Sequence, residues 1–324
     1  MMNWVFSSGP AAALAAAALW AASSLIYSRV RLSAWELNFG KNVVASVALL
    51  LIWLAGRGSA QLSMPADFRT VLLLALSSLL GIVLGDTLYF RSLQILGPRH
   101  ALMLSTTSPL FGLAFGTLLL NQFLTVANLV GIALTLIGIV AVILERGGRS
   151  DAAGYHGGTT TIAVLLGLAA AASTAVGGML SHMATHDSAS GSGCSAFDAT
   201  VIRVVTAAVT TGLLLSFRRS LRQTSARVFA PSLLKSYLPA VVMGPILGIW
   251  MSQIALQKSL LAVAITLTST APLFAMPLAR IVFGTPVTAR ALLGALVAIA
   301  GVSLVGSDPS DLRSFLAVLV GWSE

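Results

Sequence analysis

Charged residues are scarce in this chain of 324 residues, since Asp, Glu, Lys and Arg together make up only 9% of it. Soluble domains usually contain about 25% of these residues. Hydrophobic residues make up 57% of the chain, which is more apolar surface than a water-soluble core buries. The composition therefore predicts an integral membrane protein whose solvent is lipid.

Cysteine is almost absent. Cys194 is the one cysteine, so an internal disulfide and a thiolate metal cluster are both excluded. His182 and His186 are four residues apart, but no further ligand lies at a suitable spacing for zinc. The phosphate-loop and dinucleotide fingerprints are missing as well. We therefore expect no metal and no cofactor. We also expect no enzyme, because Asp86 has no histidine or second acid near it at membrane depth.

Acidic residues are the scarcest charged group, which leaves a net charge of +9. The basic residues occupy short segments between apolar runs, as positive-inside topology requires, so they do not indicate a nucleic-acid partner. The loops that follow spans one, three, five and seven hold most of them. This places the termini outside, whereas the family resemblance described below places them in the cytoplasm. The orientation stays open.

Long apolar runs, by contrast, are abundant. A run of about 20 apolar residues crosses a bilayer, and its backbone must satisfy its own hydrogen bonds as a helix. No segment alternates with period two, as a membrane barrel would. We predict an all-α membrane protein with ten spans, at about 9–28, 36–55, 71–95, 98–120, 124–144, 161–182, 197–217, 232–256, 259–283 and 287–306.

The chain repeats itself at a shift of 163 residues. Gly81 then falls on Gly244, Gly85 on Gly248 and Pro109 on Pro272, without a gap from 81 to 142. This predicts one repeat in residues 1–150 and another in residues 155–306, followed by a short interfacial or disordered tail at 307–324. Five spans per repeat is an odd number, so the second copy would be inverted. Inverted repeats are a transporter architecture with the substrate site near the midplane.

Two segments carry a resemblance to a known family. They read "ALMLSTTSPLFGLAFGTLLLNQFLTVANLVGIALTLIGIVAV" and "AITLTSTAPLFAMPLARIVFGTPVTARALLGALVAIAGVSLV". Each resembles the last two helices of the EamA domain of the drug/metabolite transporter superfamily. The family usually has a Gly-Glu pair between those helices, where this chain has Asn121-Gln122 and Gly284-Thr285. The resemblance implies a ten-helix secondary transporter, usually an exporter of small metabolites, amino acids or drugs.

Pro109 and Pro272 lie near the middle of spans four and nine. Proline lacks the N–H that the helix needs and clashes with the preceding turn. Hydroxyl groups precede both prolines, at Ser105, Thr106 and Thr107 and at Thr268, Ser269 and Thr270. Two interpretations are open: packing kinks with self-satisfied hydroxyls, or a cavity wall with hinges. The duplication favours the second.

Three charged residues fall inside predicted spans. Asp86 is in span three, Lys41 in span two, and the repeat places Arg203 in span seven. A charge at this depth usually faces the interior and has a partner, and we expect Asp86 to pair with Lys41. Three interpretations of Asp86 are then open: half of a fixed structural pair, a group that couples protons to transport, or a direct contact with substrate. Lys41 and Arg203 together would favour carboxylate substrates, although a pair with Asp86 would cancel one of the two charges.

Aromatic and amide side chains complete the predicted pocket. They are Trp20, Tyr89, Gln94, Trp250, Gln253 and Gln257. For Trp20 and Trp250, simple packing is the competing interpretation. We predict a transporter in the inner (plasma) membrane whose partners are a small-molecule substrate and the bilayer. Proton coupling, and the choice between monomer and homodimer, stay open. A membrane-embedded signalling or assembly protein, which needs no cavity, is the alternative.

Overall fold

The computed structural model describes residues 8–56, 67–145, 160–186, 194–217, 220–283 and 289–305. The predicted tail at 307–324 and the Gly284-Thr285 pair lie outside these residues. Throughout the described part, the regular elements are helices. The first half of the chain forms α2 (Gly9–Tyr27), α3 (Ala34–Ala55), α4 (Phe68–Ser78), η1 (Leu79–Gly85), α5 (Asp86–Ser105), α6 (Ser108–Leu118) and α7 (Val126–Glu145).

The second half follows the same order. It forms α8 (Thr160–His186), α9 (Ala196–Phe217), α10 (Leu221–Val228), α11 (Pro231–Val241), η3 (Val242–Gly248), α12 (Ile249–Lys258), α13 (Leu261–Thr268), α14 (Ala271–Phe283) and α15 (Ala289–Val305). Within the described residues, six continuous helical stretches are long and apolar enough to cross a membrane. They are Gly9–Tyr27, Ala34–Ala55, Phe68–Leu96, Thr161–Thr185, Ala196–Phe217 and Pro231–Lys258.

The remaining four apolar helical stretches are shorter: Ser108–Leu118, Val126–Ala141, Leu261–Ala275 and Leu292–Leu304. Spans four and nine are thus not the continuous helices that their hydropathy predicted. Thr106 and Thr107 interrupt the first, and Ser269 and Thr270 interrupt the second. Each interruption comes just before a proline at the second position of the next helix, where the missing N–H costs nothing.

The irregular segments match between the two halves. The π-helical segments η1 and η3 each have seven residues and begin 163 positions apart, at Leu79 and Val242. The helices α6 and α14 that follow the interruptions also begin 163 positions apart. This is the shift at which the sequence repeats, so the two copies share their local distortions as well as their letters.

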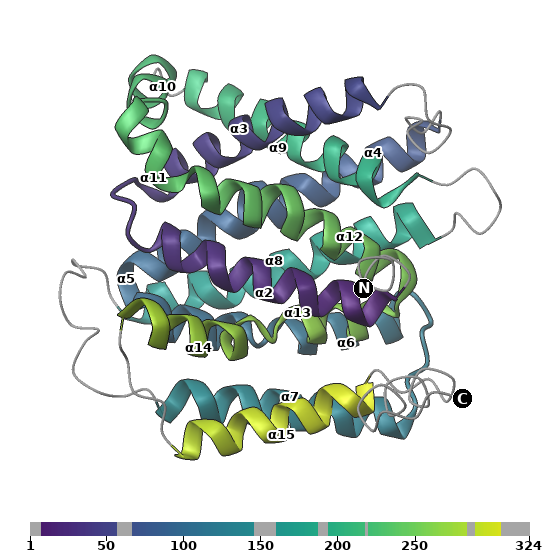
Figure 1. Cartoon of the computed structure of the whole chain (residues 1–324). Coiled ribbons are helices and arrows are strands. Elements are labelled where there is room, and N and C mark those ends of the chain that lie inside the picture. The colour runs from purple at the N-terminus through teal and green to yellow at the C-terminus, as the bar shows by residue number, and fades with distance from the viewer. Residues whose placement is uncertain are drawn as a thin grey trace.

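Helices from one half lie against helices from the other. Contacts join α7 with α15, α3 with α9, α2 with η3 and α12, α8 with η1 and α5, and α6 with α13. Figure 1 shows α7 and α15 side by side at one edge of the bundle, and shows α2 beginning and α15 ending at the same side of the molecule. The centre of the protein is therefore an interface between the two halves.

Small residues allow this close approach. Ala12, Ala13 and Ala16 on α2 are completely buried in a cluster formed mainly with the second half of the chain. In lipid, where apolar side chains gain little by leaving the solvent, small residues associate helices by bringing their backbones into contact.

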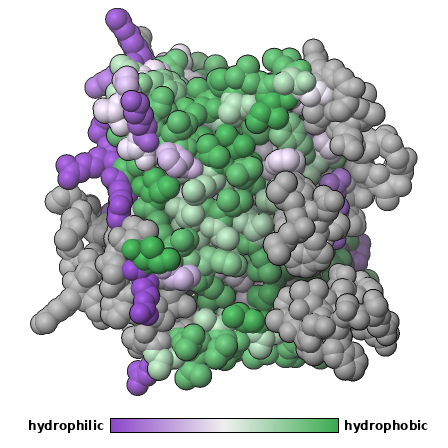
Figure 2. All heavy atoms as spheres, in the orientation of Figure 1, coloured by the Kyte–Doolittle hydropathy of each residue, from purple (hydrophilic) through white to green (hydrophobic). Residues whose placement is uncertain are grey.

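Large apolar side chains cover the outside instead. Leu118, Phe123, Phe217 and Ile281 are each more than three-quarters exposed. Figure 2 shows a broad apolar surface across the middle of the molecule, with hydrophilic residues gathered at the left edge of the view. Such a surface suits lipid and would aggregate in water. The fold is that of a multi-pass membrane protein.

Candidate functional site

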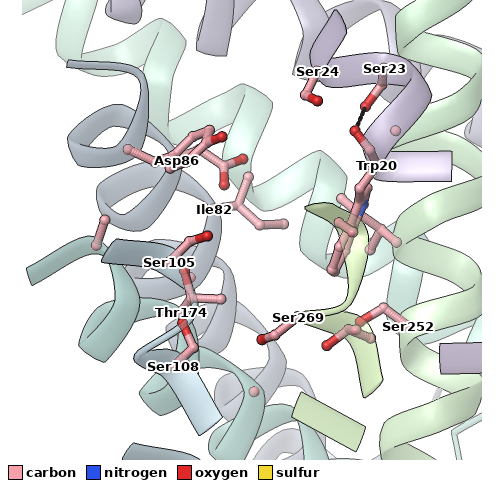
Figure 3. A pocket seen from close by; sticks show the side chains of 18 of the residues that line it. Trp20, Ser23, Ser24, Ile82, Asp86, Ser105, Ser108, Thr174, Ser252 and Ser269 are labelled. Atoms are coloured by element: carbon pink, nitrogen blue, oxygen red, sulfur yellow. Dashed lines mark hydrogen bonds between the residues drawn. The ribbon is translucent and has the colours of Figure 1, made fainter. Parts of the chain in front are cut away.

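A cavity of about 270 Å³ lies between the two halves. Its volume is near the lower end of the range for small-molecule sites. Both halves supply its walls, through α2, α3, η1, α5 and α6 from the first and through α8, α9, η3, α12, α13 and α14 from the second. Figure 3 shows Asp86, Ser105 and Thr174 on one side of this space and Trp20 on the other.

Glycines in the π-helical segments leave room for polar side chains of this wall to pack against the backbone. A Cβ atom on Gly248 would lie 2.6 Å from Trp20 Nε1, and one on Gly244 would lie 3.0 Å from Ser23 Oγ. The same arrangement occurs in the other half, where a Cβ on Gly85 would lie 3.1 Å from Thr174 Oγ1. Each half therefore presents bare backbone to polar side chains of the other half.

Lys41 on α3 and Asp86 on α5 form an ion pair, with Nζ 2.7 Å from Oδ2. The pairing predicted from sequence depth is confirmed. The lysine side chain is only 4% exposed, whereas the aspartate side chain is 35% exposed. A second, longer contact joins Lys41 Nζ to Asn42 Oδ1 at 3.4 Å. The lysine is thus the sealed member of the pair, and the carboxylate is the member that is open toward the cavity.

Arg203 on α9 also lines the cavity and is 7% exposed. Its Nε is buried and has no hydrogen-bond partner among the described residues. In the same part of the chain, no carboxylate oxygen lies within 4.0 Å of its guanidinium group. Gly81 makes room for it, since a Cβ atom there would lie 3.2 Å from Nη2. A charge buried in this way is costly unless something pairs with it.

Hydroxyl groups and rings make up the rest of the predicted wall. Nine of the predicted residues line the cavity, namely Trp20, Lys41, Asp86, Tyr89, Ser105, Arg203, Thr268, Ser269 and Pro272. Thr268 Oγ1 donates to the carbonyl oxygen of Ala264 at 2.9 Å, and Ser269 Oγ donates to that of Ile265 at 2.8 Å. These two hydroxyls are satisfied within α13, and their oxygens can still accept from a solute.

Six predicted residues lie outside this wall: Gln94, Thr106, Pro109, Trp250, Gln253 and Gln257. The amides find protein partners instead. Gln94 Nε2 donates to the Leu32 carbonyl at 3.3 Å, and Gln257 Nε2 donates to the Cys194 carbonyl at 3.4 Å.

Gln253 is fully buried, and its Oε1 accepts from Ser181 Oγ at 2.5 Å. Trp250 packs edge-on against Phe197, with ring centroids 5.2 Å apart, as its packing interpretation expected. Thr106 and Pro109 are buried beside the helix interruption. These four side chains therefore lie within the protein interior around the cavity.

Several wall residues were not predicted. They are chiefly small polar and aromatic residues: Ser23, Ser24, Tyr27, Phe90, Ser108, Thr174 and Ser252. Three of them could have been predicted from their spacing, because Ser23, Ser24 and Tyr27 follow Trp20 at three, four and seven residues. Such residues share one helix face.

Gln122 joins the two halves through hydrogen bonds to α13 and α8. Its Oε1 accepts from the Leu261 backbone N–H at 3.0 Å, at the start of α13. Its Nε2 lies 2.6 Å from His182 Nε2, and His182 Nδ1 lies 2.6 Å from the Leu256 carbonyl oxygen. Because the carbonyl must accept, Nδ1 carries the proton and Nε2 accepts from Gln122. His182 thus has hydrogen-bond partners at both ring nitrogens.

Asn121, the residue before it, has a φ of 52°. This left-handed conformation favours glycine, and asparagine is among the few other residues that adopt it readily. The Gly-Glu pair expected from the resemblance is thus replaced by a residue that tolerates the same backbone and by an uncharged amide.

Comparisons with known proteins agree with this architecture. The profile of the EamA-like transporter family matches residues 7–144 and again residues 161–307. A solved crystal structure, described only as that of a protein, matches with a TM-score of 0.67 and 19% identity over 92% of this chain and 96% of that chain. At this identity the match shows the fold alone. A comparison with curated proteins gave no match.

Proposed function

The chain belongs to the EamA-like transporter family, and on that premise we propose that it is a secondary transporter of small solutes, by alternating access through the central cavity. The observation that carries the proposal is that both family copies supply polar side chains to one cavity. Transporters built from inverted repeats bind substrate at this place, between the halves and near the midplane. The solutes are metabolites, amino acids or drugs.

The proposed topology has ten spans as two inverted five-helix repeats, with residues 1–150 and 155–306 as the two units. Six long helical stretches and four shorter apolar ones support it. The interruptions before α6 and α14 suit such a mechanism, because broken helices at membrane depth are tolerated where they line a cavity. The family is one of membrane transporters, and we place this member in the inner (plasma) membrane.

We propose further that the protein exports its substrate and that Asp86 couples this export to proton entry. Asp86 opens onto the cavity, while its partner Lys41 is sealed behind it. Protonation of the carboxylate would dissolve the ion pair and change the charge of the cavity by one unit. A solute that binds one charge state better than the other would then be linked to the proton.

Proteoliposome flux tests the proposal. Purified protein is reconstituted and offered a panel of amino acids, organic acids and drugs, with and without a proton gradient. Saturable flux that protein-free liposomes lack is the expected result. Absence of flux for the whole panel in both directions, together with a stable protein partner captured from cells, would overturn transport in favour of an assembly role.

The coupling residue has its own test. Asp86→Asn should abolish gradient-driven transport while sparing counterflow of substrate, because the neutral amide mimics the protonated acid. Glu36→Gln is the matched control, since Glu36 pairs with Arg227 at 2.9 Å outside the cavity. Gradient-driven transport that survives Asp86→Asn would refute the coupling role.

A further inference from the structure

The two halves differ at one charged position of the cavity. Helices α3 and α9 each have 22 residues and begin 162 positions apart, which makes Arg203 the counterpart of Lys41. In the first half, Asp86 at the start of α5 faces Lys41. The residue 163 positions after Asp86 is Ile249, at the start of α12. The first cation of the cavity therefore faces an acid, whereas the equivalent position for the second cation holds an apolar side chain.

The surroundings of Arg203 leave this gap open. Helix α9 contacts α12 as α3 contacts α5, and both Ile249 and Arg203 line the cavity. Among the described residues that line the cavity, the acidic one is Asp86, and its carboxylate pairs with Lys41. An arginine needed only for stability would be expected to have a partner inside the protein, because an unpaired buried charge destabilises the fold.

We propose that Arg203 binds the carboxylate of a small organic monoanion, which takes the place of the acid absent at position 249. The inference rests on the proposed transport function and names its substrate class. Lys41 and Asp86 cancel each other, so Arg203 gives the charged side chains of the described wall a net charge of +1. One carboxylate matches that charge. The guanidinium group also presents its donors in a plane that fits a carboxylate with two parallel hydrogen bonds.

The remainder of the wall suits the body of such a solute. Trp20, Tyr89, Phe90, Ile82 and Ile265 contribute apolar and aromatic surface. Hydroxyls such as Ser269 can accept hydrogen bonds from the solute. The cavity of about 270 Å³ fits a ring with one short polar group. A phosphate monoester would bring about two negative charges, and the second would find no further uncancelled cation among the described residues of this wall.

Three compounds of one shape separate charge from size: benzoate, benzamide and benzamidine. Their binding to the purified full chain in detergent can be measured by the ligand-dependent shift of its thermal unfolding. Benzoate should bind most tightly. Arg203→Gln should weaken benzoate at least about 10-fold and leave benzamide unchanged, because a hydrogen bond to a charged group is lost. Arg69→Gln, at an exposed arginine outside the cavity, is the matched control.

A second variant tests the carboxylate assignment by adding an acid next to Arg203. Ile249→Asp should place a carboxylate before Arg203, as Asp86 stands before Lys41, and so abolish the preference for benzoate. Ile249→Asn has nearly the same shape without the charge, and should retain more of the preference than Ile249→Asp. The comparison between these two variants isolates charge from any common effect on folding.

Equal affinity for the three compounds, tighter binding of benzamidine, or a benzoate preference that survives Arg203→Gln would overturn the carboxylate assignment. Flux of neutral or cationic solutes would then leave the transport function intact. Conversely, a benzoate preference that depends on Arg203 supports the anion site. It would do so even if the proteoliposome assay showed no flux and the transport proposal failed.

Discussion

Removing Asp86 alone should cost more stability than removing both members of the Lys41–Asp86 pair. In Asp86→Asn the lysine stays buried, and its Nζ keeps Asn42 Oδ1 at 3.4 Å and the Phe90 ring, whose centroid is 5.9 Å away. In Lys41→Met the aspartate keeps its 35% exposure toward the cavity and can be hydrated there. We therefore expect Asp86→Asn to be the more destabilising single change, and the double variant to recover part of the loss.

The geometry sets the magnitude. Two unit charges 2.7 Å apart attract by about 6 kcal/mol at an effective dielectric constant of about 20, and by about 1.5 kcal/mol in water. The half-open aspartate places this pair between those limits, and part of the attraction offsets desolvation of the lysine. We expect Asp86→Asn to cost about 3 kcal/mol, Lys41→Met to cost about 1–2 kcal/mol, and the coupling energy between them to be about 2 kcal/mol.

A double-mutant cycle measures these energies through reversible unfolding in mixed detergent micelles, followed by circular dichroism. The exposed pair of Arg227 with Glu36, at 2.9 Å, serves as the reference, with an expected coupling below about 1 kcal/mol. Additive single changes at Lys41 and Asp86, with a coupling energy no larger than that of the reference pair, would refute the reasoning.

Three other predictions concern packing and reactivity. Gly248→Ala should destabilise the fold by about 1–3 kcal/mol in the same unfolding assay, because its Cβ would lie 2.6 Å from Trp20 Nε1 and 2.9 Å from a backbone oxygen. Gln122→Ala should cost about 1 kcal/mol, because the Leu261 N–H loses its capping acceptor; no change in unfolding would reject that role. Burial, with a smaller contribution from a nearby acid, raises the pKa of the Cys194 thiol to about 12. Maleimide should therefore label it only after unfolding, and rapid labelling of the native protein at neutral pH would contradict this.

Much of the fold was predictable because lipid imposes one simple pattern on the sequence. Apolar runs gave most helical segments to within a few residues, and η1 and η3 begin 163 residues apart, the shift at which the sequence repeats. The boundary expected between spans three and four was wrong, because α5 continues through it to Ser105, and helix α10 was not expected. The interruptions in spans four and nine could not be predicted from hydropathy, because hydropathy does not depend on where helical hydrogen bonding between backbone groups stops. The 163-residue shift did not align the first helix of each half. Gly85 lies against Thr174 as Gly248 lies against Trp20, which makes Thr174 the counterpart of Trp20. Trp20 and Thr174 are 154 positions apart, so an alignment at 163 does not pair them.

The site was predictable where charge and depth narrowed the choice, as for Asp86 and Lys41. The amides Gln94 and Gln257 were predicted to line the pocket, but they donate to backbone carbonyl groups outside the cavity wall. Serine and threonine carried too little information, because in a helix they usually bond to their own preceding turn, as Thr268 does. The sequence held no signal for Thr174, which lines the cavity and lies against Gly85 of the other half.

The wide turns η1 and η3 also set the angular phase of everything that follows them. Each residue of an α-helix advances the side-chain direction by about 100°. A π-helical turn holds about one residue more than an α-helical turn, so winding the seven residues of η1 as regular α-helix would rotate Asp86 by roughly 100°, away from Lys41. The same change in η3 would turn Ser252 from the cavity. Each half therefore depends on its own local widening to keep its polar groups aimed at the same central space.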